Sequence, residues 1–260
     1  MSALLETRSL ARNFGAVTAA ADIDVSINAG EIVGVIGSNG AGKTTFINMV
    51  TGYLQPSSGD ILFKGKSIVG KNPRQVMRAG ICRSFQVAQL FPELTVLDNV
   101  LIAYGLMQHR VLPMFRPLAT GNSIKQAENL LQEYGIESYL PEKVMTLPQG
   151  VRKLLDIALA MLREPEVLLL DEPTSGVAID DKFDLMDTVM QAVRKSGAGV
   201  LFVEHDMEVI ARYSTRLIAF YDGRVLADGP VAEVMDNEKV KELVTGHHLE
   251  IDYKREVAHA

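Results

Sequence analysis

The sequence has little that would direct the chain into a membrane or out of the cell. Cys82 is the one cysteine among 260 residues, so no disulfide framework can form and a reducing compartment is expected. No apolar run approaches the roughly 18–20 residues that a membrane-spanning helix needs. The N-terminal residues also lack the basic start and apolar stretch of a signal peptide. These absences predict a soluble protein, although one that could dock on a membrane component.

The chain also lacks an excess of basic residues. It has 26 lysines and arginines against 32 aspartates and glutamates, which gives a net charge of −6 and a pI near 5.4. Proteins that bind nucleic acid usually carry a basic face or tail, so this balance argues against that class of partner. The apolar share of 47% is enough for a sizeable core and excludes a disordered chain.

Short apolar runs alternate with stretches of helical periodicity. Continuous apolar runs are typical of parallel strands buried on both faces, and they occur at 31–37, 166–171, 199–206 and 216–223. Together they predict one α/β domain with a wound parallel sheet, which binds ligands at the carboxyl ends of its strands. The apolar spacing between these runs predicts a core of about 1–86 and 165–229, a helical subdomain of about 87–164 and a helical C-terminal tail at 230–260.

The segment GSNGAGKT at 37–44 fits the pattern of a phosphate-binding loop. Its glycines permit backbone angles and close approaches that a Cβ atom would forbid. The loop N–H groups and the start of the following helix then surround phosphate oxygens. Lys43 would reach the β- and γ-phosphates and the Thr44 hydroxyl would ligate Mg²⁺. The residues expected to contact the nucleotide here are Gly37, Ser38, Asn39, Gly40, Ala41, Gly42, Lys43, Thr44 and Thr45.

The run that ends in Asp171 and Glu172 predicts a second part of the site. In VLLLDEPTSG, at 167–176, an apolar strand precedes two carboxylates. A strand this hydrophobic is buried, so both carboxylates are expected at its ligand-binding end. Adjacent residues of a strand point to opposite faces. We therefore assign Asp171 to Mg²⁺ and Glu172 to an attacking water, as general base or orienting group.

With these motifs in this order, the chain closely resembles the nucleotide-binding subunits of ABC transporters over nearly all of residues 5–229. The resemblance implies a P-loop NTPase core with a parallel wound sheet, an antiparallel β edge and a helical subdomain. It also implies further site residues. Gln86 in RSFQ would meet Mg²⁺ and the water, and His205 in VEHDM would contact the γ-phosphate. Phe14 in RNFGAV would stack on adenine, with a structural role in the core as the alternative.

The resemblance places the family's signature segment at Pro148, Gln149 and Gly150. Family signatures begin with a serine whose hydroxyl contacts the γ-phosphate held by the partner subunit, and proline has neither a hydroxyl nor a backbone N–H. Gly150 still permits close approach, and a helix expected to begin near Val151 directs its positive end at the phosphate. One lost hydrogen bond costs about 0.5–1.5 kcal/mol. We therefore expect a weakened but competent segment, with a dead signature or an unrelated turn as alternatives.

The implied function is that of an ATP-binding and ATP-hydrolysing motor of an importer, with ATP and Mg²⁺ as its ligands. The segments SFQVAQLFPELTVLDNV, LPQG and DEPTSGV look most like those of branched-chain or hydrophobic amino-acid importers. Importers of urea, short amides or aromatic acids, and lipopolysaccharide exporters, are similar alternatives. The implied partners are permease subunits that span the membrane, a second identical or paralogous ATPase chain and, in the wider complex, an extracytoplasmic solute-binding protein. The chain would then lie on the cytoplasmic face of the cell membrane and bind no nucleic acid.

Two other function classes stay open at this point. A soluble ABC-type ATPase acting on ribosomes or DNA usually carries two cassettes or an inserted coiled coil or zinc module, whereas this chain has one cassette and one cysteine. A nucleotide-binding subunit with weak turnover would fit Pro148, and also Ala178, which stands where the family often has an acidic or amide residue that contacts the opposite subunit. The intact Glu172 and His205 argue against weak turnover. Residues 105–122 are expected to form a surface loop, with a contact to the transporter as the alternative.

Overall fold

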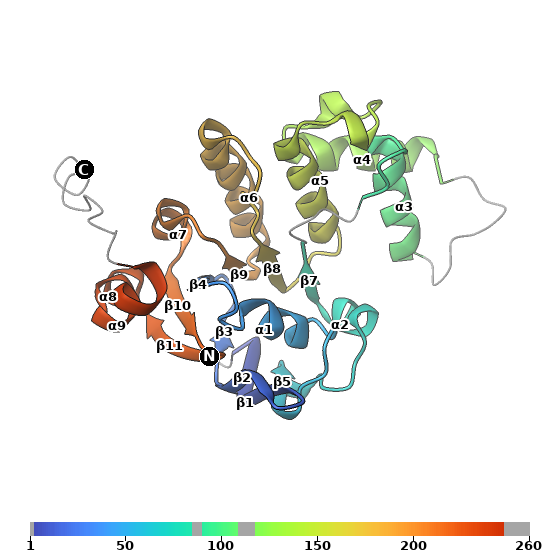
Figure 1. The fold of residues 1–260 in the computed structure, drawn as a ribbon. Helices are drawn as coiled ribbons and strands as arrows, with labels where there is room; N and C mark the ends of the chain where they lie inside the picture. The colour runs from blue at the N-terminus through green and yellow to red at the C-terminus, as the bar shows by residue number, and fades with distance from the viewer. Residues whose placement is uncertain (1–2, 85–89, 109–117, 247–260) are drawn as a thin grey trace.

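Figure 1 shows a computed structural model of the chain, which describes residues 3–84, 90–108 and 118–246. Within these residues, the central sheet has six strands in the order β11 (Arg224–Gly229), β10 (Arg216–Tyr221), β4 (Ile32–Gly37), β9 (Gly199–Val203), β8 (Val167–Asp171) and β7 (Ile81–Arg83). The strands from β10 to β7 pair in parallel, and β11 pairs antiparallel with β10 at the edge. The carboxyl ends of β4, β9 and β8 therefore lie side by side, where wound sheets bind ligands.

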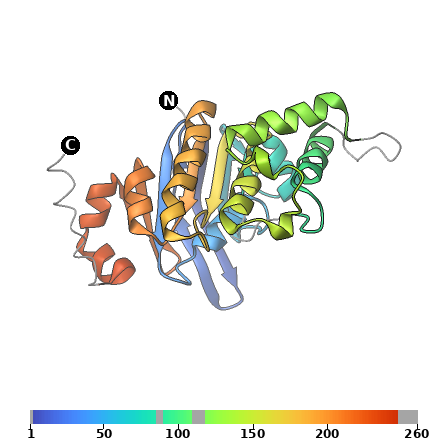
Figure 2. The same ribbon diagram turned by 90° about the horizontal axis from the view of Figure 1, so that it is seen from above.

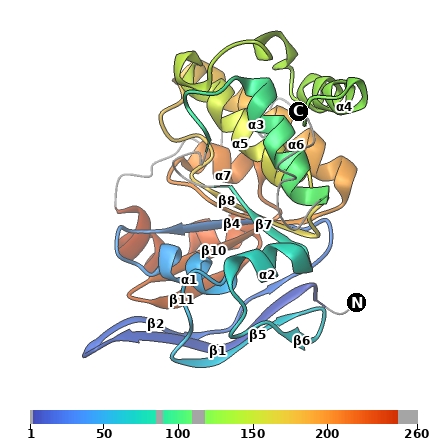
Figure 3. The same ribbon diagram turned by 90° about the vertical axis from the view of Figure 1, so that its right-hand side faces the viewer.

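A second, antiparallel sheet lies below the first in Figure 3. It is built from β1 (Leu5–Phe14), β2 (Val17–Ile23), β3 (Ser26–Ile27), β5 (Ser58–Phe63) and β6 (Lys66–Ser67). Helix α1 (Lys43–Val50) lies between the two sheets, and α2 (Pro73–Ala79) lies beside it (Figures 1 and 3). Asn72 and Gln75 begin α2 with a reciprocal pair of side-chain-to-backbone hydrogen bonds, which satisfies N–H groups that a helix start leaves without partners.

The central strands explain why their sequences read as continuous apolar runs. Every residue of β4, β8 and β9 is buried, and successive side chains alternate between two separate cores. In β8, Leu168 and Leu170 face one core, whereas Val167 and Leu169 face the other. The strands are therefore covered on both faces, as parallel strands usually are.

The helices divide between the two faces and one side of the central sheet. Helices α6 (Lys182–Ser196) and α7 (Met207–Tyr213) cover the face opposite α1, while α3 (Val96–Gln108), α4 (Gly121–Glu133) and α5 (Gln149–Met161) gather at the side of β7 (Figures 1 and 2). The chain continues past β11 into α8 (Val231–Asp236), α9 (Glu238–Val240) and a short π-helical turn at Lys241–Thr245. Among the residues that the structure describes, no helix has both the length and the apolar character needed to cross a lipid bilayer.

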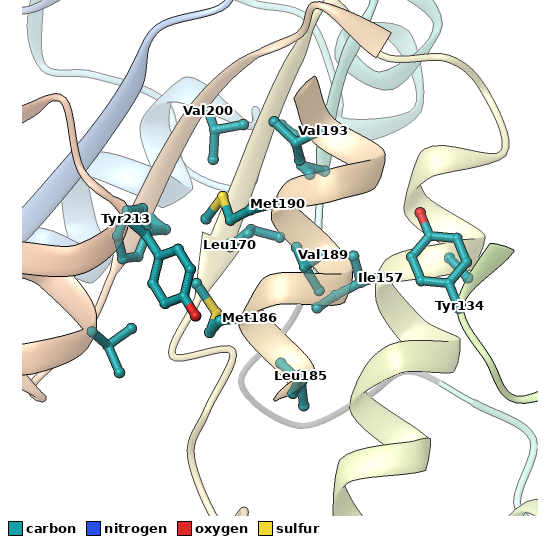
Figure 4. Packing of buried hydrophobic residues seen from close by; sticks show 14 of the residues in the cluster. Tyr134, Ile157, Leu170, Leu185, Met186, Val189, Met190, Val193, Val200 and Tyr213 are labelled. Atoms are coloured by element: carbon teal, nitrogen blue, oxygen red, sulfur yellow. The ribbon is translucent and has the colours of Figure 1, made fainter. Parts of the chain in front are cut away.

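Helix α6 fills the core between the sheet and α5 (Figure 4). Its buried stripe recurs at helical spacing and consists of Leu185, Met186, Val189, Met190 and Val193. This stripe packs with Leu170 of β8, Val200 of β9 and Ile157 of α5. The core thus joins the strands that end at the site to the helix that follows Pro148.

Replacing Leu170 by alanine is expected to lower the free energy of unfolding by about 2–5 kcal/mol, because the lost methyl groups leave a cavity at a fully buried position. The matched control is Leu106→Ala on α3, where the leucine is 46% exposed and the cost should stay within about 1 kcal/mol. Urea unfolding followed by circular dichroism measures both values. Equal losses at the two positions would contradict the packing described for β8.

The structure confirms the expected α/β fold with a wound parallel sheet and an antiparallel β edge. Two local expectations were wrong in extent. The strand expected over 199–206 is shorter and ends at Val203. The loop expected over 105–122 is also shorter at both ends, because α3 extends to Gln108 and α4 begins at Gly121. Residues 109–117 lie outside the described residues. The division of the chain into an α/β core and a helical subdomain stays a prediction.

Candidate functional site

The predicted phosphate loop connects the carboxyl end of β4 to the start of α1. A Cβ atom on Gly37 would lie 2.6 Å from the Phe220 carbonyl oxygen, and one on Gly42 would lie 2.8 Å from the Ala19 carbonyl oxygen. Gly42 also has a φ of +96°, a left-handed conformation that residues with a side chain rarely adopt. Close packing against β10 and β2 therefore requires glycine at both positions, and the loop backbone stays open to a ligand.

Gly42→Ala is expected to weaken ATP binding at least tenfold. The new methyl group adds left-handed strain of about 1–2 kcal/mol and meets backbone atoms of Ala19 and Gly223 that cannot give way. Titration with a fluorescent ATP analogue measures the dissociation constant. Gly70→Ala is the control, because Gly70 has a φ of +83° but no atom within 4 Å of its added Cβ. Unchanged affinity in the Gly42 variant would show that the loop tolerates a side chain there.

Lys43 is the first residue of α1 and its side chain turns back over the loop. The ammonium donates hydrogen bonds to the Gly37 carbonyl oxygen at 2.5 Å and to the Ser38 carbonyl oxygen at 3.1 Å. Burial lowers the pKa of Lys43, and the charges of Glu172 and Asp171 partly oppose that shift. The ammonium is therefore held beside the loop and within the electrostatic reach of both acidic residues.

Glu172 and His205 face each other across neighbouring strands. The Glu172 Oε1 atom lies 3.1 Å from the His205 Nε2 atom, and their side chains are 20% and 49% exposed. The expectation that Asp171 and Glu172 alternate along one strand was wrong. Strand β8 ends at Asp171, and Glu172 turns out of it with a φ of +48°. Its N–H still donates to the Val203 carbonyl oxygen at 3.0 Å, which anchors the turn to β9.

Asp171 is held by a residue that sequence reasoning did not select. The Arg83 guanidinium donates to the Asp171 Oδ2 atom at 2.6 Å, with both side chains only 9% exposed, and to the Asn48 Oδ1 atom at 2.6 Å. Arg83 comes from β7, next to β8 in the sheet. Arg83 is the last residue of β7, and no pattern in its own segment indicates that it pairs with a carboxylate 88 residues further along the chain.

The residues near the loop fit a magnesium ion that arrives with a nucleotide. Mg²⁺ usually takes one or two protein carboxylates or hydroxyls together with substrate phosphates and water. Thr44 is exposed in the first turn of α1 and Asp171 ends β8, so the chain offers a hydroxyl and a carboxylate at one edge of the sheet. Gln86, the third expected ligand, lies outside the described residues. Within the described part of the chain, no cluster of three histidine, cysteine or acidic residues suited to a metal occurs.

Phe14 ends β1 and pairs with Val17 across a tight hairpin. Its ring is 49% exposed, with the Arg12 guanidinium 4.7 Å from the ring centre. The same hairpin borders the phosphate loop, because β2 contributes the Ala19 carbonyl that lies against Gly42. Phe14 is thus an exposed aromatic on a hairpin whose other strand contacts the loop, so the alternative of a core residue was wrong. Its stacking on adenine stays a prediction.

The expected signature segment lies at the start of α5. Pro148 is the exposed cap residue, and α5 begins at Gln149, two residues earlier than the expected start near Val151. Gln149 packs its side chain against Gly176, and a Cβ on Gly150 would contact Val177. The segment therefore lies against the turn that follows the acidic pair.

Comparison with known proteins places these observations in a family. Residues 20–175 match the family described as ABC transporter. The probable branched-chain amino acid transport ATP-binding protein LivG of Archaeoglobus fulgidus is 31% identical over 94% of this chain and 95% of its own length. The high-affinity branched-chain amino acid transport ATP-binding protein LivG of Escherichia coli K12 is 32% identical over 91% of this chain and 95% of its own length.

Solved structures agree with this match. The ADP conformation of MJ1267, an ATP-binding cassette of an ABC transporter, superposes with a TM-score of 0.82 at 28% identity, covering 94% of this chain and 98% of that one. A nucleotide-free ATP-binding cassette from an ABC transporter also gives a TM-score of 0.82 at 28% identity, over 93% and 98% of the two chains. The family expected from the motifs is confirmed: the chain belongs to the ABC transporter family, as one of its ATP-hydrolysing cassettes.

Proposed function

We propose that the chain is the ATP-hydrolysing subunit of an importer for branched-chain amino acids. The observation that carries the proposal is the Glu172–His205 pair, 3.1 Å apart after β8 and β9, with β9 next to the strand that leads into the phosphate loop. A carboxylate and an imidazole beside a phosphate-binding loop are suited to phosphoryl transfer to water. The substrate class is supported by the relatives from Archaeoglobus and Escherichia, which are named as branched-chain amino acid transport proteins and align with more than nine tenths of this chain.

In this proposal the phosphate loop and Lys43 bind the triphosphate. The Lys43 ammonium leaves the Gly37 and Ser38 carbonyl oxygens and donates to the β- and γ-phosphates instead. The Phe14 ring stacks on the adenine, since it is exposed on the hairpin that borders the loop. Thr44 and Asp171 hold the Mg²⁺ that accompanies the nucleotide, with Gln86 as a further ligand. When bound, this ion neutralises charge on the phosphate oxygens.

Glu172 orients a water molecule for in-line attack and accepts its proton. His205 donates a hydrogen bond to the γ-phosphate, and Lys43 offsets the charge that develops there. Because Glu172 and His205 lie 3.1 Å apart, both groups can act on the same γ-phosphate. Hydrolysis then removes the terminal phosphate and with it the contacts that depend on it.

A second cassette completes the site. The start of α5, at Pro148, Gln149 and Gly150, is exposed or half-buried, and the N–H groups of Gln149 and Gly150 belong to the free end of a helix. Facing the partner's phosphate loop, these N–H groups contact the γ-phosphate bound there. ATP thus joins two cassettes because it contacts both, and hydrolysis releases them. Permease subunits that span the membrane convert this motion into transport, with an extracytoplasmic solute-binding protein delivering the amino acid.

Uptake in the cell that makes this chain tests the proposed function. Deletion of its gene should lower the uptake of radiolabelled leucine, isoleucine and valine at least tenfold at micromolar concentrations. The intact chain should restore uptake and the Lys43→Ala variant should not. Urea and an aromatic amino acid serve as comparison solutes. Normal branched-chain uptake with a loss of urea uptake would place the chain in a different importer.

A further inference from the structure

A buried lysine on α5 reaches the backbone of Glu172. Lys153 is 1% exposed, and its ammonium donates to the Glu172 carbonyl oxygen at 3.0 Å. Asp156, one turn further along α5, and Glu204, at the end of β9, are also buried, at 7% and 4% exposure. Burial lowers the pKa of Lys153, while the charges of Asp156, Glu204, Glu172 and Asp171 oppose that shift. A charged ammonium that is buried this completely requires hydrogen-bonding or charged partners, and the Glu172 carbonyl oxygen is one of them.

The backbone that Lys153 holds is in an unfavourable conformation. Glu172 has a φ of +48°, a left-handed conformation that is unfavourable for a residue with a side chain and persists only where the surroundings enforce it. Besides Lys153, the Glu172 carbonyl oxygen accepts a hydrogen bond from the Ser175 N–H at 3.1 Å. These contacts fix the direction in which the Glu172 side chain leaves the strand end.

A buried carboxylate ties the same turn to His205. The Glu204 Oε1 atom accepts hydrogen bonds from the Thr174 N–H at 2.8 Å and from the Thr174 hydroxyl at 2.7 Å. Its Oε2 atom accepts from the His205 N–H at 3.2 Å. One carboxylate therefore binds the segment that follows Glu172 and the residue that faces Glu172. Glu172 and His205 thus share the support of Glu204, and Lys153 adds a hydrogen bond from α5 to the backbone of Glu172 in the same turn.

We propose that Lys153 is a positioning residue that couples the position of α5 to the direction of the Glu172 carboxylate. This rests on the proposed function, in which the start of α5 contacts ATP held by the partner cassette. Lys153 lies in the second turn of that helix. The helix that contacts the partner's nucleotide therefore also holds Glu172, the general base of its own site. The bond is 3.0 Å long, and a contact stretched to about 3.6 Å is no longer a hydrogen bond, so a small displacement of α5 releases the Glu172 turn.

The contact between Lys153 and Glu172 can link the two nucleotide sites, whereas a link through Ala178 was in doubt. Ala178 has no polar side chain to contact the opposite subunit, and it precedes a short 3-10 turn at Ile179–Asp181. The contact between Lys153 and Glu172 crosses from α5 to β8 within one chain. Occupation of the partner's site then prepares Glu172 for hydrolysis in this one.

The experiment measures ATP hydrolysis and ATP affinity in the complex purified with its membrane subunits. Lys153→Met removes the ammonium but keeps an unbranched apolar stem. It should lower kcat about 10- to 100-fold, since small misplacement of a catalytic group has effects of this size, with the ATP dissociation constant changed less than threefold. Lys153→Arg keeps a donor and should recover most of the lost kcat. Lys182→Met is the matched control, because Lys182 pairs with Asp206 rather than Glu172, and its kcat should stay within twofold.

Combination with Glu172→Gln decides how Lys153 acts. If Lys153 works through the Glu172 carboxylate, Lys153→Met should cause no further loss in a chain that already carries Glu172→Gln. An equal loss in both backgrounds would overturn the proposal. Should the methionine variant fail to fold, Lys153→Gln, which keeps a polar end but is too short to reach the carbonyl, replaces it in the same cycle. Normal turnover of the Glu172→Gln single variant would instead contradict the proposed role of Glu172 and would be seen before any Lys153 variant is compared.

Discussion

Glu172→Gln should lower ATP turnover by about 10²–10⁴-fold, the usual contribution of a general base, while ATP still binds. Glutamine keeps the size of the side chain and its contact with His205, but its amide cannot accept a proton from water. The phosphate loop and Lys43 are untouched, so the dissociation constant of ATP should change less than threefold. Single-turnover hydrolysis measures the first effect, and titration with a fluorescent ATP analogue measures the second.

The same variant tests whether the segment at Pro148 binds the nucleotide held by a partner cassette. Light scattering after size exclusion, with and without ATP, would detect a dimer that forms only with ATP and persists because hydrolysis is blocked. A variant that stays monomeric would mean that Pro148 and Ala178 weaken the closed pair, so that closure requires the permease or a different ATPase chain. Glu208→Gln, on the exposed first turn of α7, is the control and should keep normal turnover. Near-normal turnover of Glu172→Gln would refute the role given to that residue.

Lys43→Ala should weaken ATP binding about 10- to 150-fold, since hydrogen bonds to charged groups contribute about 1.5–3 kcal/mol. The lysine is 7% exposed and already lies over the loop, so little ordering is needed when it moves to the phosphates. Calorimetric titration of ATP into the purified chain measures the change.

Two comparisons make this result specific. Lys125→Ala removes an exposed lysine of α4 and should leave the affinity unchanged. AMP, which has no β- or γ-phosphate, should bind the Lys43→Ala variant and the unaltered chain with similar affinity. Unchanged ATP affinity in Lys43→Ala would contradict the assignment of Lys43 to the terminal phosphates.

The sequence was sufficient for features that depend on neighbouring residues. The phosphate loop is one: its glycines, its lysine and the apolar run before it occupy adjacent positions, and the structure gives them the expected strand, loop and helix. The apolar runs of the central strands are another, because burial on both faces requires every residue of β4, β8 and β9 to be apolar or small up to the strand end. The antiparallel sheet, in contrast, was expected only from the family resemblance.

Features that depend on distant residues could not be read in the same way. The conformation of Glu172 was wrongly expected to continue β8. Its backbone instead makes tertiary contacts, since Lys153, 19 residues earlier, donates to its carbonyl oxygen and its N–H donates to β9. Arg83 and Asp171 are 88 residues apart, and nothing local in either segment specifies that they meet. Local patterns thus predicted which residues gather at the strand ends, whereas the directions of their side chains follow from tertiary contacts.

The position of β4 in the sheet has a consequence for how the chain folds during synthesis. Strand β4 lies between β9 and β10, and the Ile32 N–H donates to the Thr215 hydroxyl, 183 residues further along. Gly37 packs against Phe220 and Gly42 against Gly223. On a ribosome, the phosphate motif therefore emerges long before the strand that shapes it, and contacts this distant in sequence form slowly. A nascent chain that ends before β10 carries the whole motif and still lacks the geometry that holds ATP.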